Sequence, residues 1–460
     1  MGGIKLLSLQ SEYLNKIDVF ISKNKEQIIE DLRKLVVIPS VRTDALPHAP
    51  YGKACADALY KSVELFEENG FPGRVDKSVK YAVSTYQRGE KTIGLFAHCD
   101  VVPADGEWLY GEPFELTHRD GFLIGRGSND DKSGIIQMLY AAKIIKELGL
   151  PLKSSLLFFI GACEEDGMED MIEFKKNEPI PDVSLIPDGV YPYICAEKSR
   201  ITLLLESNQT LENITQISGG TTYNVILEKL NLEYTDGNLE TVRGISGHAA
   251  NPDGSDNALI KFARDAQSNS HLSKKDKELF YNISCLFEDN YGTGFGIYND
   301  DEFFGKLTCA NGIVSTNSGK LRISLDIRHS PSVAGDKIIS AIRHKTGDMW
   351  KIIDSHTSTG YIIPDSNPYA IAIKNAYRKL SGIQDAEPIK ANGGTYSKHL
   401  VNSFSIGTDM YAHSPKFNFP EGHGSEHSPD EAISIDGFFE SIKTLIIFIL
   451  ELDLLLYNMP

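Results

Sequence analysis

Short apolar runs alternate along the chain with longer stretches in which apolar residues have helical spacing. The runs at residues 92–97, 155–161 and 184–187 predict buried strands, because strands covered on both faces carry almost continuous apolar sequence. This alternation is typical of an α/β domain with a mostly parallel central sheet and helices on both faces. The other expected elements are helices at residues 25–37, 53–69, 134–148 and 369–380 and strands at residues 81–86 and 403–406.

The pattern changes in the middle of the chain. Residues 201–206 and 320–328 alternate between apolar and polar positions, which predicts half-buried strands, and a stretch of helical spacing lies between them. A proline-rich hinge then precedes a return to the α/β pattern. The sequence therefore predicts an α+β domain at residues 196–363, inserted into an α/β domain formed by residues 1–195 and 364–460.

Side chains suited to metal binding follow three of the predicted strands. His98 follows the first strand, Glu164 and Glu165 follow the second, and Asp188 follows the third. Open parallel sheets bind ligands outside the carboxyl ends of their strands, so these side chains are expected to share one crevice. Imidazole and carboxylate groups are ligands of zinc and related cations. The sequence therefore predicts a metal centre at this edge of the sheet.

Two polar loops offer further ligands. Asp130 and Asp131 stand together in a glycine-containing loop that leads into an apolar helix, and His427 lies in a second polar loop near the last helix. Asp131 could instead act as the helix N-cap, a position that aspartate favours. His98 and Asp100 are two residues apart on an extended segment, so their side chains should share a face.

Composition narrows the class of protein. Of 460 residues, 41% are hydrophobic and 24% are charged, which is ordinary for a globular protein of two domains. The formal net charge of −17 argues against a nucleic-acid partner. The six cysteines are widely spaced and form no Cys-x-x-Cys pair, so we expect reduced thiols and a cytoplasmic location. The apolar run at residues 445–450 is too short for a membrane span, and we expect no membrane association.

Five motifs together resemble a known family. The chain is similar to the M20 family of di-metal peptidases, and within it to the dipeptidase V branch of bacterial dipeptidases. The motifs that carry this resemblance are His98-x-Asp100, Gly127-x-x-Asp130-Asp131-Lys132, Glu164-Glu165, Asp188 and His427-x-Pro429-Asp430-Glu431.

The resemblance implies a pair of divalent cations and assigns their ligands. Asp130 would bridge the two ions. His98 and Asp188 would complete the protein ligands of one ion, and Glu165 and His427 those of the other. Carboxylate and imidazole ligands suit Zn²⁺, Mn²⁺ and Co²⁺, so the residues do not select one metal.

The resemblance also implies two roles beside the metals and one backbone feature. Glu164 would be the general acid/base, which takes the proton of the attacking water and delivers it to the leaving amine. Asp100 would hold the second ring nitrogen of His98, as metal-bound imidazoles usually require. The family carries a cis peptide between its paired aspartates, here Asp130 and Asp131.

In the inserted domain the resemblance points to a lid over the substrate. His248 would stabilise the oxyanion after lid closure, Asn224 would assist at the same oxygen, and Arg328 would grip the substrate carboxylate with its planar guanidinium. Arg328 could instead pair with an acid of the lid. A loop of the larger domain would line the substrate site through Gly393, Gly394 and Thr395.

These observations favour a hydrolase that cleaves the peptide bond of dipeptides with water activated by two Zn²⁺ or Mn²⁺ ions, Co²⁺ being a third candidate. The enlarged lid suggests a monomer, since the resemblance implies that its extra segment replaces a partner subunit. Two alternatives stay open. One is an N-acyl amino acid deacylase of the acetylornithine or succinyl-diaminopimelate type, and the other is a binding homologue that has lost turnover.

Overall fold

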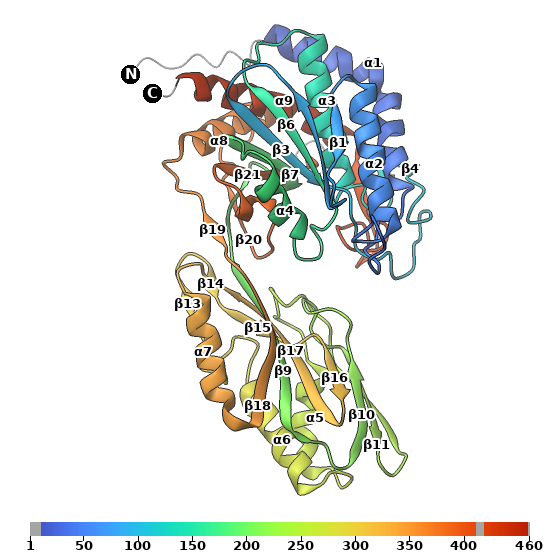
Figure 1. The fold of residues 1–460 in the computed structure, drawn as a ribbon, viewed down its shortest axis with the longest axis vertical. Helices are drawn as coiled ribbons and strands as arrows, with labels where there is room; N and C mark the ends of the chain where they lie inside the picture. Colours follow the sequence, from blue (N-terminus) through green and yellow to red (C-terminus); the bar gives the residue numbers. More distant parts are fainter. Residues whose placement is uncertain (1–10, 411–417, 459–460) are drawn as a thin grey trace. The chain divides into compact units, whose positions relative to one another are not determined.

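The computed structural model describes residues 11–410 and 418–458, and the chain in it divides into two compact units (Figure 1). The first unit contains Met1–Cys195, Ile363–Ile389 and Thr395–Pro460. The second contains Ala196–Ile362 together with the short segment Lys390–Gly394. The chain thus leaves the first unit, forms most of the second, and goes back to the first. It then contributes five more residues to the second unit before it ends in the first.

A six-stranded sheet forms the centre of the first unit. Its order is β1-β2-β6-β3-β7-β21, and β6, β3, β7 and β21 are parallel to one another. Strand β2 runs antiparallel to β6, and β1 runs antiparallel to β2. The strands are β1 (Gly73–Val75), β2 (Tyr81–Tyr86), β3 (Thr92–His98), β6 (Ser155–Gly161), β7 (Val183–Gly189) and β21 (Ser403–Gly407).

Both faces of this sheet are covered. On β3, Leu95 belongs to one apolar cluster with five helices, and Phe96 belongs to another cluster with α4. Successive strand residues point to opposite faces, so this division follows from the alternation along each strand. The five helices are α1 (Ser11–Val36), α2 (Lys53–Glu68), α3 (Lys132–Glu147), α8 (Pro368–Ser381) and α9 (Ile435–Asn458), and α4 is Glu169–Asn177. Short β4 (Thr117–Arg119), β5 (Phe122–Ile124) and β22 (Ala432–Ser434) form a small separate sheet.

The second unit is built on an eight-stranded sheet with three helices. Seven strands follow the order β12-β11-β10-β16-β17-β9-β18, β15 also pairs with β17, and every pairing is antiparallel. The strands are β9 (Ser199–Thr210), β10 (Ile214–Gly219), β11 (Lys229–Tyr234), β12 (Leu239–Arg243), β15 (Thr308–Ala310), β16 (Val314–Asn317), β17 (Lys320–His329) and β18 (Trp350–Ser358). The helices are α5 (Ala258–Asp265), α6 (Lys274–Leu286) and α7 (Gly335–Thr346).

Smaller elements complete the described chain. Strands β8 (Ile194–Glu197), β19 (Tyr361–Ile362) and β20 (Ile389–Ala391) form a three-stranded sheet, and β13 (Asp300–Asp301) pairs with β14 (Gly305–Lys306). Short 3-10 helices are η2 (Ala266–Ser268), η3 (Gly347–Met349) and η4 (Tyr396–His399).

The observed class is the predicted one: an α/β unit with a mostly parallel sheet and an α+β unit. One helix is longer than expected, because α1 begins at Ser11 and buries Ile17 and Ile21 ahead of the predicted start. All six cysteines are free thiols. Among the described residues, no helix combines the length and apolar character that crossing a membrane requires.

Candidate metal centre

Parallel strands deliver the predicted ligands to one edge of the first unit's sheet. His98 is the last residue of β3, Glu164 and Glu165 follow the end of β6, and Asp188 lies near the end of β7. Since β3, β6 and β7 are parallel, their carboxyl ends meet at the same edge. The geometry that the sequence predicted for these four side chains is therefore present.

Asp130 stands between two histidines that are far apart in the sequence. Its Oδ1 lies 2.9 Å from Nε2 of His98, and its Oδ2 lies 2.9 Å from Nε2 of His427. His427 Nε2 is also 3.1 Å from Oε2 of Glu165. In the group Asp130, Glu165 and His427, one ligand atom from each residue lies within 4.8 Å of the others. One carboxylate thus presents a separate oxygen to each of two imidazoles, as a bridging ligand would.

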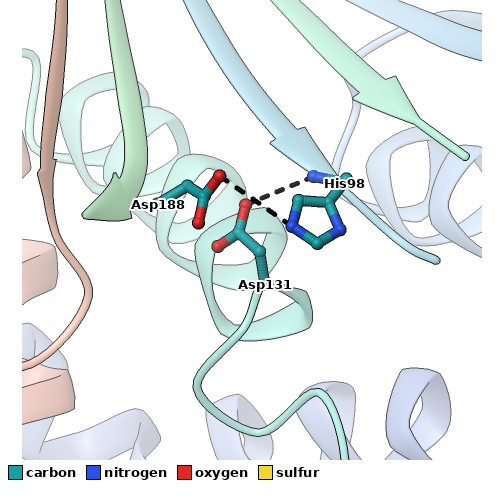
Figure 2. A group of neighbouring side chains, drawn as sticks. All are labelled: His98, Asp131 and Asp188. Carbon is teal, nitrogen blue, oxygen red and sulfur yellow. Dashed lines mark hydrogen bonds and ion pairs between the residues drawn. The ribbon is translucent and has the colours of Figure 1, made fainter. Parts of the chain in front are cut away.

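A second group adjoins the first on the other side of His98. His98, Asp131 and Asp188 each place one potential ligand atom within 4.8 Å of the others (Figure 2). His98 Nε2 lies 3.9 Å from Oδ2 of Asp188. Figure 2 shows the carboxylates of Asp188 and Asp131 on the same side of the His98 ring. The two groups together provide two neighbouring places for a cation.

The paired aspartates have different surroundings. Their peptide bond is cis, as the resemblance implied. Asp131 occupies the N-cap position of α3, yet its side chain makes no capping hydrogen bond. Its Oδ2 instead accepts from the backbone N–H of His98 at 3.2 Å, and its Oδ1 is buried without a hydrogen-bond partner among the described residues. The alternative that Asp131 merely caps the helix is therefore wrong, because the carboxylate faces the metal centre.

Asp100 supports the centre in a different way from the one expected. Nδ1 of His98 is 3.0 Å from the backbone carbonyl oxygen of Asp100 and 3.5 Å from its carboxylate. The carboxylate accepts the backbone N–H of Glu164 at 3.2 Å and that of Glu165 at 3.1 Å. Asp100 therefore holds the imidazole mainly through its carbonyl and holds the Glu164–Glu165 turn through its side chain.

The charges of the centre call for cations. Burial, followed by the charge of Asp188, raises the pKa of Glu164 and that of Asp131. Burial and then Asp130 raise the pKa of Glu165. Burial opposes the charged form of His427, but its contacts with Asp130 and Glu165 outweigh this and raise its pKa to about 11. Burial raises the pKa of the three carboxyl groups first, and the neighbouring carboxylates raise it further, because carboxylates outnumber cationic groups in this space.

Unpartnered atoms support the fit to metal ions. Among the described residues, the buried candidate ligand atoms His98 Nε2 and Glu165 Oε1 have no hydrogen-bond partner. Buried polar atoms are rarely left so, and a cation would satisfy lone pairs of this kind. The close approach of His98 Nε2 to Asp130 lacks hydrogen-bond geometry, which fits two ligands directed at a common ion. The residues present therefore suit a pair of divalent cations.

Comparison with known proteins identifies the family. The model of the family described as "Peptidase family M20/M25/M40" matches residues 94–451. The chain belongs to this family. The M20 family is metal-dependent, and the protein is accordingly a metallohydrolase. The resemblance seen in the sequence motifs is confirmed.

Named members of the M20 family align over most of the chain. The chain is 25% identical over 420 residues to the Beta-Ala-Xaa dipeptidase of Lactobacillus delbrueckii subsp. lactis. The alignment covers 83% of this chain and 88% of that protein. The di-peptidase Dug1p of Saccharomyces cerevisiae has a similar fold, with a TM-score of 0.61, 16% identity and 98% coverage of both chains. The Bacillus subtilis protein YxeP, described as a dinuclear metal binding peptidase, gives a TM-score of 0.53 at 11% identity, covering 95% of this chain and all of that one.

Three residues that the M20 resemblance singled out lie in the second unit. Arg328 is buried, and its Nε and Nη2 donate to the carboxylate of Asp326 at 2.7 and 3.3 Å. Its Nη1 donates to the backbone carbonyl of Asn392 at 3.0 Å. Pairing with an acid of its own unit, which was the alternative for Arg328, is therefore present. It leaves two of the five guanidinium N–H groups outside these three bonds.

His248 and Asn224 lie on adjacent segments of the second unit. Val225 and His248 form an isolated antiparallel bridge, and the backbone N–H of Ala249 donates to the carbonyl of Asn224 at 2.8 Å. Nδ1 of His248 accepts the backbone N–H of Ala250 at 3.1 Å. A neutral imidazole that accepts at Nδ1 carries its proton on Nε2, so His248 has the donor that stabilising an oxyanion would need.

The predicted substrate loop is divided between the two units. Gly393 and Gly394 belong to the second unit, whereas Thr395 begins a segment of the first. Thr395 Oγ1 lies 2.6 Å from Oγ of Ser405, and a Cβ at Gly393 would meet no heavy atom within 4 Å. The sequence placed all three residues in the larger domain, because it showed no break at this point.

Sequence reasoning missed a buried ion pair behind the metal centre. Arg126 Nη1 and Glu431 Oε2 lie 2.6 Å apart, and neither side chain is more than 1% exposed. Glu431 belonged to a recognised motif, but no role was assigned to it. The partners are 305 positions apart in the sequence, which explains why no local pattern revealed the pair.

Proposed function

We propose that the protein hydrolyses the peptide bond of dipeptides with two divalent cations held at the metal centre. The observation that carries the proposal is the position of Asp130, with one carboxylate oxygen 2.9 Å from His98 and the other 2.9 Å from His427. The names of the relatives support the substrate class, since one is a Beta-Ala-Xaa dipeptidase and another a di-peptidase. The description of YxeP as dinuclear supports the count of two ions.

The ligands divide between the two ions. Asp130 would bridge them, His98 and Asp188 would hold one, and Glu165 and His427 would hold the other. Asp131 faces the first ion and is a candidate additional ligand, since its carboxylate lies in the same group as His98 and Asp188. When bound, two cations there would lower the pKa of the attacking water and polarise the scissile carbonyl. Zn²⁺ and Mn²⁺ suit this ligand set, and Co²⁺ is a third candidate.

Glu164 carries the protons in this reaction. Its carboxylate is not needed as a ligand, and its Oε1 is buried without a hydrogen-bond partner among the described residues. A positioned carboxylate of raised pKa can take the proton of an attacking water and deliver it to the leaving amine. Asp100 fixes the backbone of Glu164 through its N–H, which holds the side chain in register with the ligand Glu165.

Residues of the second unit bind the substrate in this proposal. Nε2–H of His248 donates to the developing oxyanion, and Asn224 assists at the same oxygen. The N–H groups of Arg328 that remain after its bonds to Asp326 and Asn392 grip the substrate carboxylate. Gly393, Gly394 and Thr395 line the substrate. These roles rest on the M20 resemblance and on the surroundings of each residue.

Replacing Glu164 tests the proposal. Glu164→Gln should lower kcat on a mixed set of dipeptides by about 10²–10⁴-fold, because it removes the proton carrier and keeps the volume. Bound Zn²⁺ or Mn²⁺, measured by elemental analysis after dialysis, should stay at two ions per chain. Glu169→Gln provides a matched control, since Glu169 is an exposed carboxylate that pairs with Lys80 and belongs to neither group of candidate ligands.

The same assay separates the two alternatives. Turnover of N-acetyl amino acids and not of free dipeptides would identify a deacylase and overturn the dipeptidase proposal. Wild-type protein that binds two ions yet cleaves neither class would identify a binding homologue. Sedimentation of the purified protein tests the further proposal that the enzyme works as a monomer.

A further inference from the structure

One carboxylate oxygen of Glu431 holds the loop that carries Asp130. Its Oε1 accepts the backbone N–H groups of Gly127, Asn129 and Asp130, each at 3.0 Å. The side chain is fully buried. Three donors on one carboxylate oxygen fix the path of the loop over four residues, and the last of them belongs to the bridging ligand itself.

The other oxygen of Glu431 connects this loop to the one that carries His427. Oε2 pairs with Nη1 of Arg126 at 2.6 Å, and Nη2 of Arg126 donates to the backbone carbonyl of His427 at 3.3 Å and to that of Pro103 at 3.2 Å. A planar guanidinium can make these contacts together because its donors form a rigid fork. One ion pair therefore contacts the backbone of two proposed ligands, the bridging residue Asp130 and His427.

The backbone at His427 shows why such a hold is needed. Its φ is 63°, in the left-handed region that non-glycine residues seldom adopt. A non-glycine residue in that region is strained and persists only where its surroundings impose it. The Arg126 contact falls on the carbonyl of this same residue.

We propose that Arg126 and Glu431 are positioning residues that hold Asp130 and His427 at the separation required by the second cation, the one bound by Asp130, Glu165 and His427. This inference rests on the proposed two-cation function. The first cation would share Asp130 but would keep three further candidate ligands, His98, Asp188 and Asp131, none of which contacts the Arg126–Glu431 pair among the bonds described above. Two of the three ligands of the second cation, Asp130 and His427, contact the pair. Loss of the pair should therefore weaken the second site selectively, and outer partners of metal ligands typically contribute 10–100-fold in affinity.

The test compares Glu431→Gln with wild type and with a matched control. A glutamine can accept from the loop N–H groups or pair with Arg126, but its amide cannot do both, because only one of its two terminal atoms is an acceptor. Asp453→Asn is the control. Asp453 is also a buried carboxylate that accepts backbone N–H groups, from Lys153 and Ser154, which stand at the opposite end of β6 from Glu164.

Two readouts are independent of turnover. Titration of the metal-free protein with Mn²⁺ in a calorimeter should give two sites for wild type and for Asp453→Asn. In Glu431→Gln one site should be retained within about threefold and the other weakened 10–100-fold. Amide hydrogen exchange of the metal-free protein should be faster at residues 127, 129 and 130 in Glu431→Gln alone.

The outcomes distinguish this inference from the proposed function. Wild-type protein that binds no Mn²⁺ would overturn the two-cation proposal. Wild-type protein with two sites and a Glu431→Gln variant with the same two affinities would overturn the positioning role, as would equal weakening of both sites in Glu431→Gln. If Glu431→Gln fails to fold, Arg126→Lys keeps the charge but cannot contact both Glu431 and the His427 carbonyl, and the same selective loss is expected.

Discussion

The guanidinium of Arg328 lies against the carboxylate of Asp326, with Nε 2.7 Å from Oδ1, and both side chains are buried. Asp326 Oδ2 also pairs with Nη2 of Arg200 at 2.6 Å. Burial, followed by the opposing influence of Asp326, leaves the pKa of Arg328 somewhat lowered, but an arginine keeps its proton at any physiological pH. Asp326 therefore fixes the orientation of the charged Arg328 guanidinium. The remaining N–H groups of that guanidinium can donate to a substrate carboxylate.

Replacement of Arg328 tests this orientation. Arg328→Lys should raise KM for dipeptides with a free carboxylate by about 10–100-fold, because a bidentate charge-assisted contact contributes roughly 1.5–3 kcal/mol and lysine cannot form it. Dipeptide amides, which lack that charge, should show little change. Steady-state kinetics on the two substrate forms provides the measurement. An equal loss on both forms would mean that Arg328 supports the unit rather than the substrate.

A second prediction concerns the proton on His248. His248→Ala should lower kcat about 10²–10³-fold, because it removes a donor to the oxyanion. Metal content should be unchanged, since His248 is not among the proposed ligands. His271→Ala, which removes an exposed histidine of the same unit paired with Asp236, should leave kcat unchanged. Loss of metal from His248→Ala would contradict the assigned role.

Metal ions should stabilise the first unit. Their binding at a hundred times Kd adds about 2.7 kcal/mol for one site, which corresponds to a rise in Tm on the order of 5–10 °C for a domain of this size. Thermal unfolding with a chelator and then with added Zn²⁺ or Mn²⁺ measures the change. The increment should shrink at acidic pH, because protons compete for His98 and His427. If the Tm at neutral pH is the same with and without the chelator, the protein does not bind metal tightly.

Glu451 gives a pH dependence of stability unrelated to the metals. Burial on α9, partly offset by Lys379, raises the pKa of Glu451 to about 7. The folded protein therefore binds more protons than the unfolded chain between about pH 4.5 and pH 7, so this residue's contribution to stability is present at low pH and is lost as the pH rises through 7.

Glu451→Gln should consequently gain about 1–3 kcal/mol of unfolding free energy at pH 8 and show little change at pH 4.5. Denaturant unfolding at the two pH values provides the comparison. Glu90→Gln, at an exposed position, should change stability at neither pH. Equal effects at both pH values would refute the assignment to a titrating Glu451.

Gly161 should not tolerate a larger residue. A Cβ there would lie 1.9 Å from the Tyr396 hydroxyl and 2.3 Å from a carboxylate oxygen of Asp170. Asp170 accepts from the Tyr396 hydroxyl and from the backbone N–H groups of Ala162 and Cys163, which lead directly to Glu164. Gly161→Ala is therefore expected to cost about 1–3 kcal/mol and to lower kcat as well.

Gly335→Ala is the matched control for this change. Its Cβ would lie at an ordinary 3.5 Å from Ile201, so its stability should be unchanged or slightly higher. Thermal unfolding and kcat measured on both variants make the comparison. A Gly161→Ala protein as stable and active as wild type would show that Tyr396 and Asp170 can move away without consequence.

Local patterns predicted the strands well, because continuous apolar runs such as residues 155–161 leave few alternatives in a covered sheet. They could not predict that β2 runs antiparallel to β6, since strand direction depends on the connection and not on the residues of the strand. The proximity of the candidate ligands could be predicted because strand ends and motif spacing converge on one edge of the sheet; their roles as ligands stay a prediction.

Contacts between distant segments were not accessible from the sequence. Asp131 was a candidate cap because aspartate favours that position, whereas the structure turns its carboxylate toward the backbone of His98. The Arg126–Glu431 pair spans 305 residues and has no periodic signal. Both failures concern buried polar groups, whose partners depend on the complete fold.

The proposed ligands of the two metal ions come from residues as far apart in the sequence as His98 and His427. A growing polypeptide made from its amino end would present the first cation's side chains long before the second cation's last imidazole had been joined. Any chain that stops ahead of residue 427 would hold Asp130 with only one histidine opposite it. Binding of both cations would thus be a late event in the synthesis of the chain. Truncated chains would bind at most one of the two cations.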